Sequence, residues 1–222
     1  KKLWFNMILT NLKKRILTSI ILLSLIYLMF NYDEILALCL IIIGVISLLE
    51  FFEIIRKIIK SKFNQLIINS FFIIYISFFC IVFFLLLNFL YLKILILSLL
   101  LTCIASDIGG FVFGKIFKGP KLTNISPNKT ISGALGSILF SCIIFVTLIY
   151  TFTDKFSFKI LIIGISTSIF CQVGDLFFSL IKRKAKVKDT GNILPGHGGI
   201  LDRIDGILFG IPFGFLSINI LF

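Results

Sequence analysis

Apolar runs of about 20 residues recur along the whole sequence, with only short polar segments between them. A run of this length lets an α-helix cross the hydrocarbon core of a bilayer, where every backbone polar group must be paired internally. Membrane β-barrels use shorter segments of alternating polarity, whereas these runs are continuous. Charged residues make up 14% of the chain, against about 25% in a soluble domain. The sequence therefore predicts an all-α fold, a polytopic integral membrane helical bundle.

We predict seven spans, with eight or nine as alternatives because residues 66–117 can be divided differently. The predicted spans are residues 16–31, 34–55, 66–89, 92–117, 131–151, 158–183 and 201–221. The first is expected to be retained, because no small-residue cleavage site of a signal peptide follows it. We expect one membrane domain over residues 1–222, with residues 1–100 mainly as scaffold and residues 101–222 as the catalytic half.

The net charge of +12 would point to nucleic acid if the protein were soluble. With a cytoplasmic N-terminus, however, 19 of the 22 Lys and Arg residues fall in cytoplasmic segments, and Lys93, Lys155 and Lys159 are the other three. This asymmetry is what the positive-inside rule expects. We therefore expect contact with membrane lipid and anionic substrates, and no nucleic-acid partner.

Two aspartates within apolar runs are candidates for function, because ionisable residues inside a span are costly. Asp107 and Asp175 lie at a similar predicted depth below the ends of two different spans. A shared cation would relieve their repulsion. The alternative is that each pairs with a nearby Lys or Arg.

Polar chemistry is concentrated in residues 179–205, which end with Asp202 and Asp205. Their spacing puts both carboxylates on one face of the helix that begins there. Because Mg²⁺ prefers oxygen ligands, usually one or two carboxylates with water and phosphate, Asp175 and Asp202 are candidate ligands. Helix capping is the alternative explanation for one of the two aspartates near residue 201.

Residues 195–199 form a glycine-rich turn that contains His197, the only histidine. Gly198 and Gly199 let the backbone approach a ligand closely. Before a helix start, the N–H groups of such a turn can receive a phosphate.

A second polar segment, residues 124–133, also precedes a predicted span. Ser126, Lys129 and Thr130 are suited to holding phosphate oxygens, and an N-cap loop is the alternative. In the second span, Glu50 and Glu53 are expected to pair with the nearby bases Arg56 and Lys57.

Together these motifs resemble the signature of the phosphatidate cytidylyltransferases, also called CDP-diacylglycerol synthases. The matching positions are Ser179, Lys182, Arg183, Lys188, Asp189, Pro195, Gly196, His197, Gly198, Gly199, Asp202, Arg203 and Asp205. Residues 107–115, 126–130 and 172–175 resemble three further motifs of the family. There are two departures: Ser132 stands where the family usually has Glu, and Phe111 stands where Tyr is common.

The resemblance implies transfer of a cytidylyl group from CTP to phosphatidic acid, giving CDP-diacylglycerol and pyrophosphate in phospholipid biosynthesis. It implies Mg²⁺ on Asp175 and Asp202, with Asp205 and Asp107 supporting it or a second cation. The basic residues would hold the triphosphate or the lipid phosphate: Lys129, Lys182, Arg183, Lys188 and Arg203. Asp189 is a further substrate-binding candidate, and His197 and its glycines would shape the nucleotide site. A homodimer in a bacterial-type inner membrane, with the site facing the cytoplasm, is the expected setting.

Two other functions stay open at this point. A CTP-dependent polyprenol or phytol kinase could share the layout and would differ in its lipid acceptor. A membrane transporter would also place carboxylates within spans, but the polar residues here gather on one side and form no continuous route.

Overall fold

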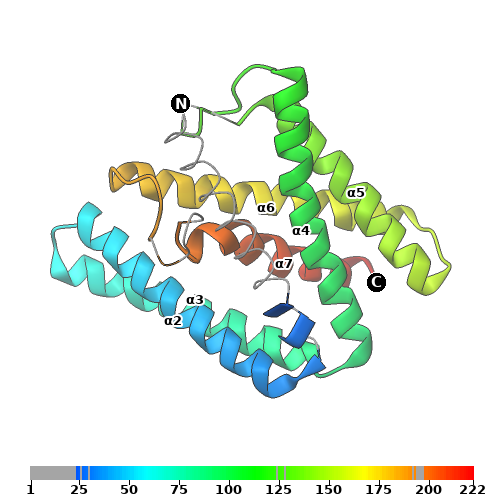
Figure 1. Cartoon of the computed structure of the whole chain (residues 1–222), viewed down its shortest axis with the longest axis horizontal. Helices are drawn as coiled ribbons and strands as arrows, with labels where there is room; N and C mark the ends of the chain where they lie inside the picture. The colour runs from blue at the N-terminus through cyan, green and yellow to red at the C-terminus, as the bar shows by residue number, and fades with distance from the viewer. Residues whose placement is uncertain are drawn as a thin grey trace, which may run out of the picture. The chain divides into compact units, whose positions relative to one another are not determined.

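The computed structural model describes residues 24–25, 27–29, 31–123, 125–127, 129–191, 193 and 198–222. Six helices in these residues are long and apolar enough to cross a membrane. They are α2 (Asp33–Ile58), α3 (Lys62–Leu87), α4 (Leu90–Phe117), α5 (Ile131–Thr153), α6 (Phe158–Lys184) and α7 (Leu201–Leu221), coloured along the chain in Figure 1. The described residues form no β-strand, so the predicted all-α membrane bundle is confirmed.

The six helices correspond to the last six predicted spans, and their ends differ from the predicted ends by at most four residues. The predicted first span, residues 16–31, lies mostly outside the described residues. The total number of spans and the side on which the chain begins stay predictions.

The chain divides into two compact units. The α2–α3 unit comprises Lys1–Phe84 and Ala185–Asp202, and the α4–α7 unit comprises Leu85–Lys184 and Arg203–Phe222. Helix α7 therefore contributes its first two residues to one unit and the rest to the other. That the chain forms a single membrane domain stays a prediction.

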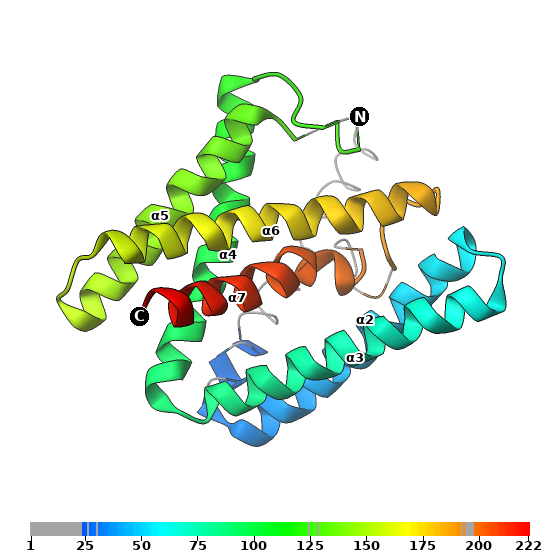
Figure 2. The ribbon, with the colours of Figure 1, turned by 180° about the vertical axis from the view of Figure 1, so that it is seen from behind.

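In the α2–α3 unit, α2 and α3 form an antiparallel hairpin and lie side by side in both views (Figures 1 and 2). The rings of Phe51 and Phe72 stack with centroids 3.8 Å apart. At Gly44 the helices are close enough for a Cβ atom to touch Cys80 and Ile76 at ordinary contact distances. Apolar packing along the hairpin thus holds α2 against α3.

The α4–α7 unit is held together by small residues where its helices meet. A Cβ atom at Gly136 of α5 would lie 2.8 Å from the carbonyl oxygen of Gly109 in α4, so only glycine fits. Hydroxyl groups join α4 to both α5 and α6: Ser137 of α5 donates to the Ser106 carbonyl of α4 at 2.7 Å, and the hydroxyls of Ser106 and Ser168 of α6 share a hydrogen bond of 2.9 Å. Small and hydroxyl-bearing residues at contacts are typical of membrane helices.

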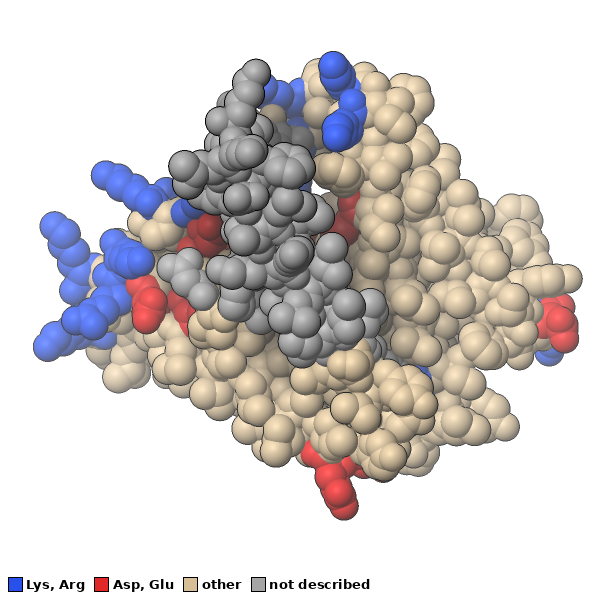
Figure 3. Space-filling model, in the orientation of Figure 1, with Lys and Arg blue, Asp and Glu red and all other residues tan. Residues whose placement is uncertain are grey.

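Large apolar side chains cover much of the described surface. On α3, for example, Phe71 is 70% exposed and Phe78 is 65% exposed. Figure 3 shows Lys and Arg side chains gathered in groups, with wide stretches between them that carry no charge. Lipid tails would cover such stretches at no cost in polar solvation.

Candidate active site

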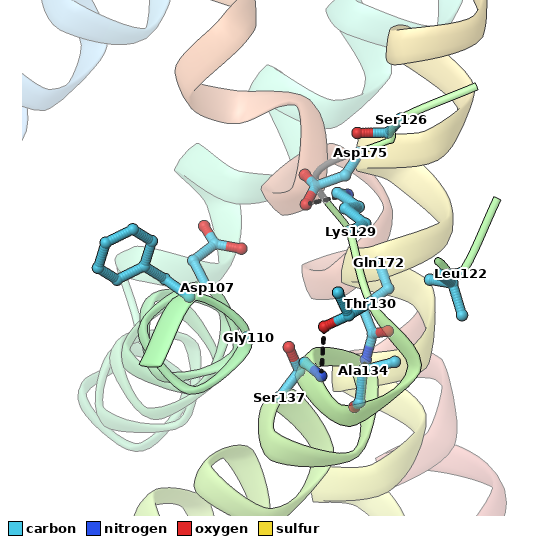
Figure 4. A pocket seen from close by; sticks show the side chains of 12 residues that line it. Asp107, Gly110, Leu122, Ser126, Lys129, Thr130, Ala134, Ser137, Gln172 and Asp175 are labelled. Atoms are coloured by element: carbon cyan, nitrogen blue, oxygen red, sulfur yellow. Dashed lines mark hydrogen bonds and ion pairs between the residues drawn. The ribbon is translucent and has the colours of Figure 1, made fainter. Parts of the chain in front are cut away.

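A pocket of about 300 Å³ opens within the α4–α7 unit (Figure 4). It is formed by α4, the α4–α5 loop, α5 and α6, and combines two carboxylates, a lysine and several small or hydroxyl-bearing residues. Its lining consists of Asp107, Gly110, Phe111, Leu122, Ser126, Lys129, Thr130, Gly133, Ala134, Ser137, Gln172 and Asp175. Five of these are predicted site residues from three separate motifs: Asp107, Ser126, Lys129, Thr130 and Asp175.

Backbone hydrogen bonds fix the α4–α5 loop around Lys129. The Lys129 N–H donates to the Ser126 carbonyl at 3.0 Å, and the Lys129 carbonyl accepts from the Leu122 N–H at 2.8 Å. Thr130 is the N-cap of α5, and its hydroxyl accepts from the Gly133 N–H at 3.1 Å. The N-cap alternative is therefore confirmed for Thr130, which also lines the pocket.

Asp175 of α6 forms an ion pair across the pocket with Lys129, whose Nζ lies 3.0 Å from Oδ2 (Figure 4). Both side chains are partly buried, at 21% and 30% exposure. Asp107 lines the same pocket from α4, and its Oδ1 lies 4.0 Å from the Cys171 thiol. For Asp175, the structure thus gives the predicted alternative of a basic partner.

Asp205 of α7 lies near Asp175, because both carboxylates lie against Gly206, whose N–H donates to Asp205 Oδ1 at 3.0 Å. It has its own basic partner, Lys182 of α6, at 3.8 Å. A Cβ atom at Gly206 would lie 2.8 Å from Asp175 Oδ1, so this glycine leaves room for the carboxylate. The result is a row of two carboxylates flanked by two lysines, Lys129–Asp175–Asp205–Lys182, within one unit.

Asp202 belongs to the α2–α3 unit, where it binds the segment before α7. Its Oδ2 accepts hydrogen bonds from the Thr190 N–H at 2.7 Å, the Thr190 hydroxyl at 3.0 Å and the Gly199 N–H at 3.2 Å. Gly198 has a φ of 83°, a left-handed conformation that favours glycine. The turn before α7 therefore depends on glycine for its backbone shape and on Asp202 for its hydrogen bonds.

Glu50 of α2 was not predicted as a site residue, yet it binds the same segment. Its carboxylate accepts from the Thr190 hydroxyl at 2.7 Å and from the N–H groups of Ile200 at 3.0 Å and Leu201 at 2.9 Å. The prediction that Glu50 pairs with Arg56 and Lys57 is wrong. Its presence in an apolar run was the signal that could have found it, but two nearby bases offered a sufficient local explanation.

The remaining predicted residues are distributed between the two units. Arg183 and Arg203 are exposed in the α4–α7 unit, and Lys188 and Asp189 are exposed in the α2–α3 unit. His197 lies outside the described residues. The predicted metal ligands Asp175 and Asp202 belong to different units, and their joint binding of one metal ion stays a prediction.

The donors in the α4–α7 unit fit a hard cation that brings further ligands with it. Among the described residues, no group of three or more His, Cys, Asp or Glu side chains could hold a metal ion by itself. Asp175 and Asp205, however, supply carboxylate oxygens side by side. Mg²⁺ commonly binds through one or two carboxylates and completes its coordination with water and substrate phosphates.

Comparison with known proteins places this arrangement in a family. The model of the cytidylyltransferase family matches residues 57–221. The chain belongs to the cytidylyltransferase family. The resemblance found in the sequence motifs is confirmed, and the match extends beyond those motifs to the whole of α3 and of α7.

Named relatives include phosphatidate cytidylyltransferases from three staphylococci. The relative from Staphylococcus haemolyticus is 45% identical over 111 residues, that from Staphylococcus epidermidis is 47% identical over 111, and that from Staphylococcus aureus strain COL is 44% identical over 109. Each match covers 48% of this chain and 42% of the relative. The matched part is thus less than half of the relatives' length.

Both departures from the family pattern lie at or near the pocket. Ser132, which replaces the usual Glu, shares a hydrogen bond of 3.1 Å with Thr130 and accepts from the Gly119 N–H at 3.3 Å. Phe111, in place of Tyr, lines the pocket, and Lys115 Nζ lies 5.6 Å from its ring centre. In this chain Ser132 therefore joins the two ends of the α4–α5 loop.

Proposed function

We propose that this cytidylyltransferase-family chain transfers the cytidylyl group of CTP to phosphatidic acid, giving CDP-diacylglycerol and pyrophosphate, with Mg²⁺, at the cytoplasmic membrane boundary. The observation that supports this best is the pocket in which Asp107, Asp175 and Lys129 meet Ser126 and Thr130. The names of the staphylococcal relatives support the same reaction.

In the proposed reaction, a phosphate oxygen of phosphatidic acid attacks the α-phosphorus of CTP. The new P–O bond forms as the bond between the α-phosphorus and the oxygen that bridges the α- and β-phosphates breaks. Pyrophosphate leaves with that electron pair. The attacking group is already an anion, so the reaction needs no strong general base. The catalytic task is to bring two polyanions together and to neutralise their charge.

Lys129 is placed to take part in that neutralisation. Its ammonium group pairs with Asp175 inside the pocket, and its flexible side chain can turn to a phosphate oxygen that enters the same space. The hydroxyl of Ser126 can donate a hydrogen bond to phosphate beside it. We propose that Lys182, Arg183, Lys188 and Arg203 attract the triphosphate and the lipid phosphate. Asp189, His197 and the glycines of its turn would shape the nucleotide site.

We propose that Asp175 and its neighbour Asp205 hold Mg²⁺, with Asp107 as a supporting carboxylate for this ion or a second cation. Bound Mg²⁺ would stabilise the negative charge that builds up on the phosphate oxygens. The two lysines that now neutralise these carboxylates would then be released toward the substrate phosphates. The role of Asp202 as a ligand stays a prediction.

The test is formation of CDP-diacylglycerol from labelled CTP and phosphatidic acid by purified protein in detergent, with Mg²⁺ and with EDTA. We expect product with Mg²⁺ and none with EDTA. Running Asp202→Asn beside the wild type tests that ligand separately, because retained activity would remove Asp202 from the metal site.

Polyprenol in place of phosphatidic acid is the control for the acceptor. Phosphorylation of polyprenol, with no CDP-diacylglycerol from phosphatidic acid under any metal condition, would overturn the proposed reaction. Release of labelled pyrophosphate from γ-labelled CTP distinguishes cytidylyl transfer from transfer of the γ-phosphate.

A further inference from the structure

Glu50 is one of the most deeply buried charged side chains described, with 4% exposure. A buried carboxylate is costly unless hydrogen bonds satisfy it. Its three hydrogen bonds with described residues come from Thr190, Ile200 and Leu201, at the start and end of the segment that leads into α7. These donors lie 140 to 151 residues away in the sequence, so Glu50 joins α2 to a distant part of the same unit.

The segment is shaped around this carboxylate. A Cβ atom at Gly191 would lie 2.6 Å from Glu50 Oε1, and a Cβ atom at Gly199 would collide with both carboxylate oxygens of Glu50. Gly199 also donates its N–H to Asp202. Two glycines therefore leave space for Glu50, and one of them belongs to the hydrogen-bond network of Asp202.

Thr190 connects the two carboxylates directly. Its hydroxyl lies 2.7 Å from Glu50 Oε2 and 3.0 Å from Asp202 Oδ2. A hydroxyl has one hydrogen to donate, so the Thr190 hydroxyl donates to one of the two carboxylates at a time. The backbone N–H of Thr190 also donates to Asp202. A shift of Glu50 would therefore also move Asp202, because Thr190 binds both carboxylates and because the N–H of Leu201, the residue before Asp202, donates to Glu50.

We propose that Glu50 is a positioning residue, which fixes the first turn of α7 and the direction of the Asp202 carboxylate through Thr190 and the N–H groups of Ile200 and Leu201. This rests on the proposed function, in which the glycines just before that turn shape the nucleotide site. Glu50 lies outside the segment that the family model matches, residues 57–221. Glu50 acts through Asp202 and the turn and needs no contact with the substrate.

Glu50→Gln is the sharpest variant, because it keeps the size of the side chain and removes one acceptor. If the amide oxygen replaces Oε2, the amide nitrogen faces the Ile200 N–H, donor against donor. If it replaces Oε1, the nitrogen faces the Leu201 N–H. Glu53→Gln is the matched control, since Glu53 lies on the same helix with its side chain exposed.

We expect Glu50→Gln to lower kcat about 10- to 100-fold, the range for residues that orient catalytic groups, with KM for CTP and the thermal midpoint close to those of the wild type. Thr190→Val should lower kcat similarly. The double variant should be no worse than the more damaged single variant, because both act through one network. Glu53→Gln should match the wild type.

Two results would overturn the proposal: a kcat for Glu50→Gln equal to that of Glu53→Gln, or a loss of activity that only follows the loss of folded protein. A readout without catalysis separates this from a failure of the proposed function. Trypsin cleavage after the exposed Lys188 should be faster in Glu50→Gln than in Glu53→Gln, whether or not the wild type makes CDP-diacylglycerol. Equal cleavage rates would overturn the anchoring itself.

Discussion

The two units hold their acidic residues in different ways. In the α4–α7 unit, Asp175 and Asp205 pair with the side chains of Lys129 and Lys182. In the α2–α3 unit, Glu50 accepts hydrogen bonds from backbone N–H groups and a threonine hydroxyl. One arrangement uses long, flexible, charged partners, and the other uses partners that are fixed in the backbone.

This difference separates two tasks. A lysine can leave a carboxylate when a metal ion or a phosphate arrives, so the carboxylates of the α4–α7 unit can exchange partners during a reaction. A backbone N–H at the start of α7 cannot leave without unwinding the turn. We infer that the carboxylates of the α4–α7 unit exchange partners during the reaction. Glu50, in contrast, keeps the same hydrogen-bond partners and holds the start of α7 in one conformation.

The largest effect is expected for Asp175→Asn. The amide keeps the shape of the side chain but removes the charge that pairs with Lys129 and would bind Mg²⁺. Activity should fall about 10³-fold, the upper range for loss of one electrostatic group in an active site. The measurement is the rate of CDP-diacylglycerol formation at saturating CTP.

Asp154→Asn is the matched control for that substitution. Asp154 is exposed and is the C-cap of α5 with a φ of 52°, a conformation that Asn also adopts readily. Its activity should equal that of the wild type. If both variants lose activity equally, the effect is not specific to the pocket and the comparison of the two units fails.

A smaller loss is expected for Lys129→Met. The variant removes the ammonium group that neutralises Asp175 and that would turn to a phosphate. The ratio kcat/KM for CTP should therefore fall about 10²-fold, chiefly through a higher KM. Lys129→Arg should recover part of the loss because it keeps a positive charge. Lys121→Met, an exposed lysine in the same loop, is the control. An unchanged KM for CTP in Lys129→Met would argue against phosphate binding by this residue.

The smallest effect is expected for Gly206→Ala, compared with Gly44→Ala in the other unit. At Gly206 the added carbon would lie 2.7 Å from the Cys171 sulfur and 2.8 Å from Asp175 Oδ1, whereas at Gly44 the nearest atom lies at 3.4 Å. The Asp175 carboxylate must therefore move, and activity should fall about 10-fold, since small displacements of catalytic groups are costly.

The stability of these two variants sharpens the comparison. Gly206→Ala should lower unfolding stability by about 1–3 kcal/mol, the usual range for overpacking, while Gly44→Ala should be close to neutral. The measurements are the thermal midpoint in detergent and the rate of CDP-diacylglycerol formation. A Gly206→Ala variant with wild-type activity would show that Asp175 tolerates displacement.

The sequence predicted the helices well because a membrane span is specified by a local property, a continuous apolar run. The same local reasoning selected Asp107 and Asp175 as costly charges and Lys129 as a phosphate ligand. It could not give the pairing of Lys129 with Asp175, which are 46 residues apart. Glu50 was missed for the same reason: its partners lie at the other end of the chain, whereas Arg56 and Lys57 lie nearby in the sequence.

The most direct test of the exchange of partners in the α4–α7 unit is metal binding without substrate. Mn²⁺ can replace Mg²⁺ as a probe, and the bound ion can be measured by electron paramagnetic resonance on the wild type, Asp175→Asn and Asp154→Asn in detergent. We predict that the wild type and Asp154→Asn bind Mn²⁺ equally, and that Asp175→Asn binds it at least about 10-fold more weakly. Equal binding by all three proteins, or no binding by the wild type, would contradict the assignment of the metal to Asp175.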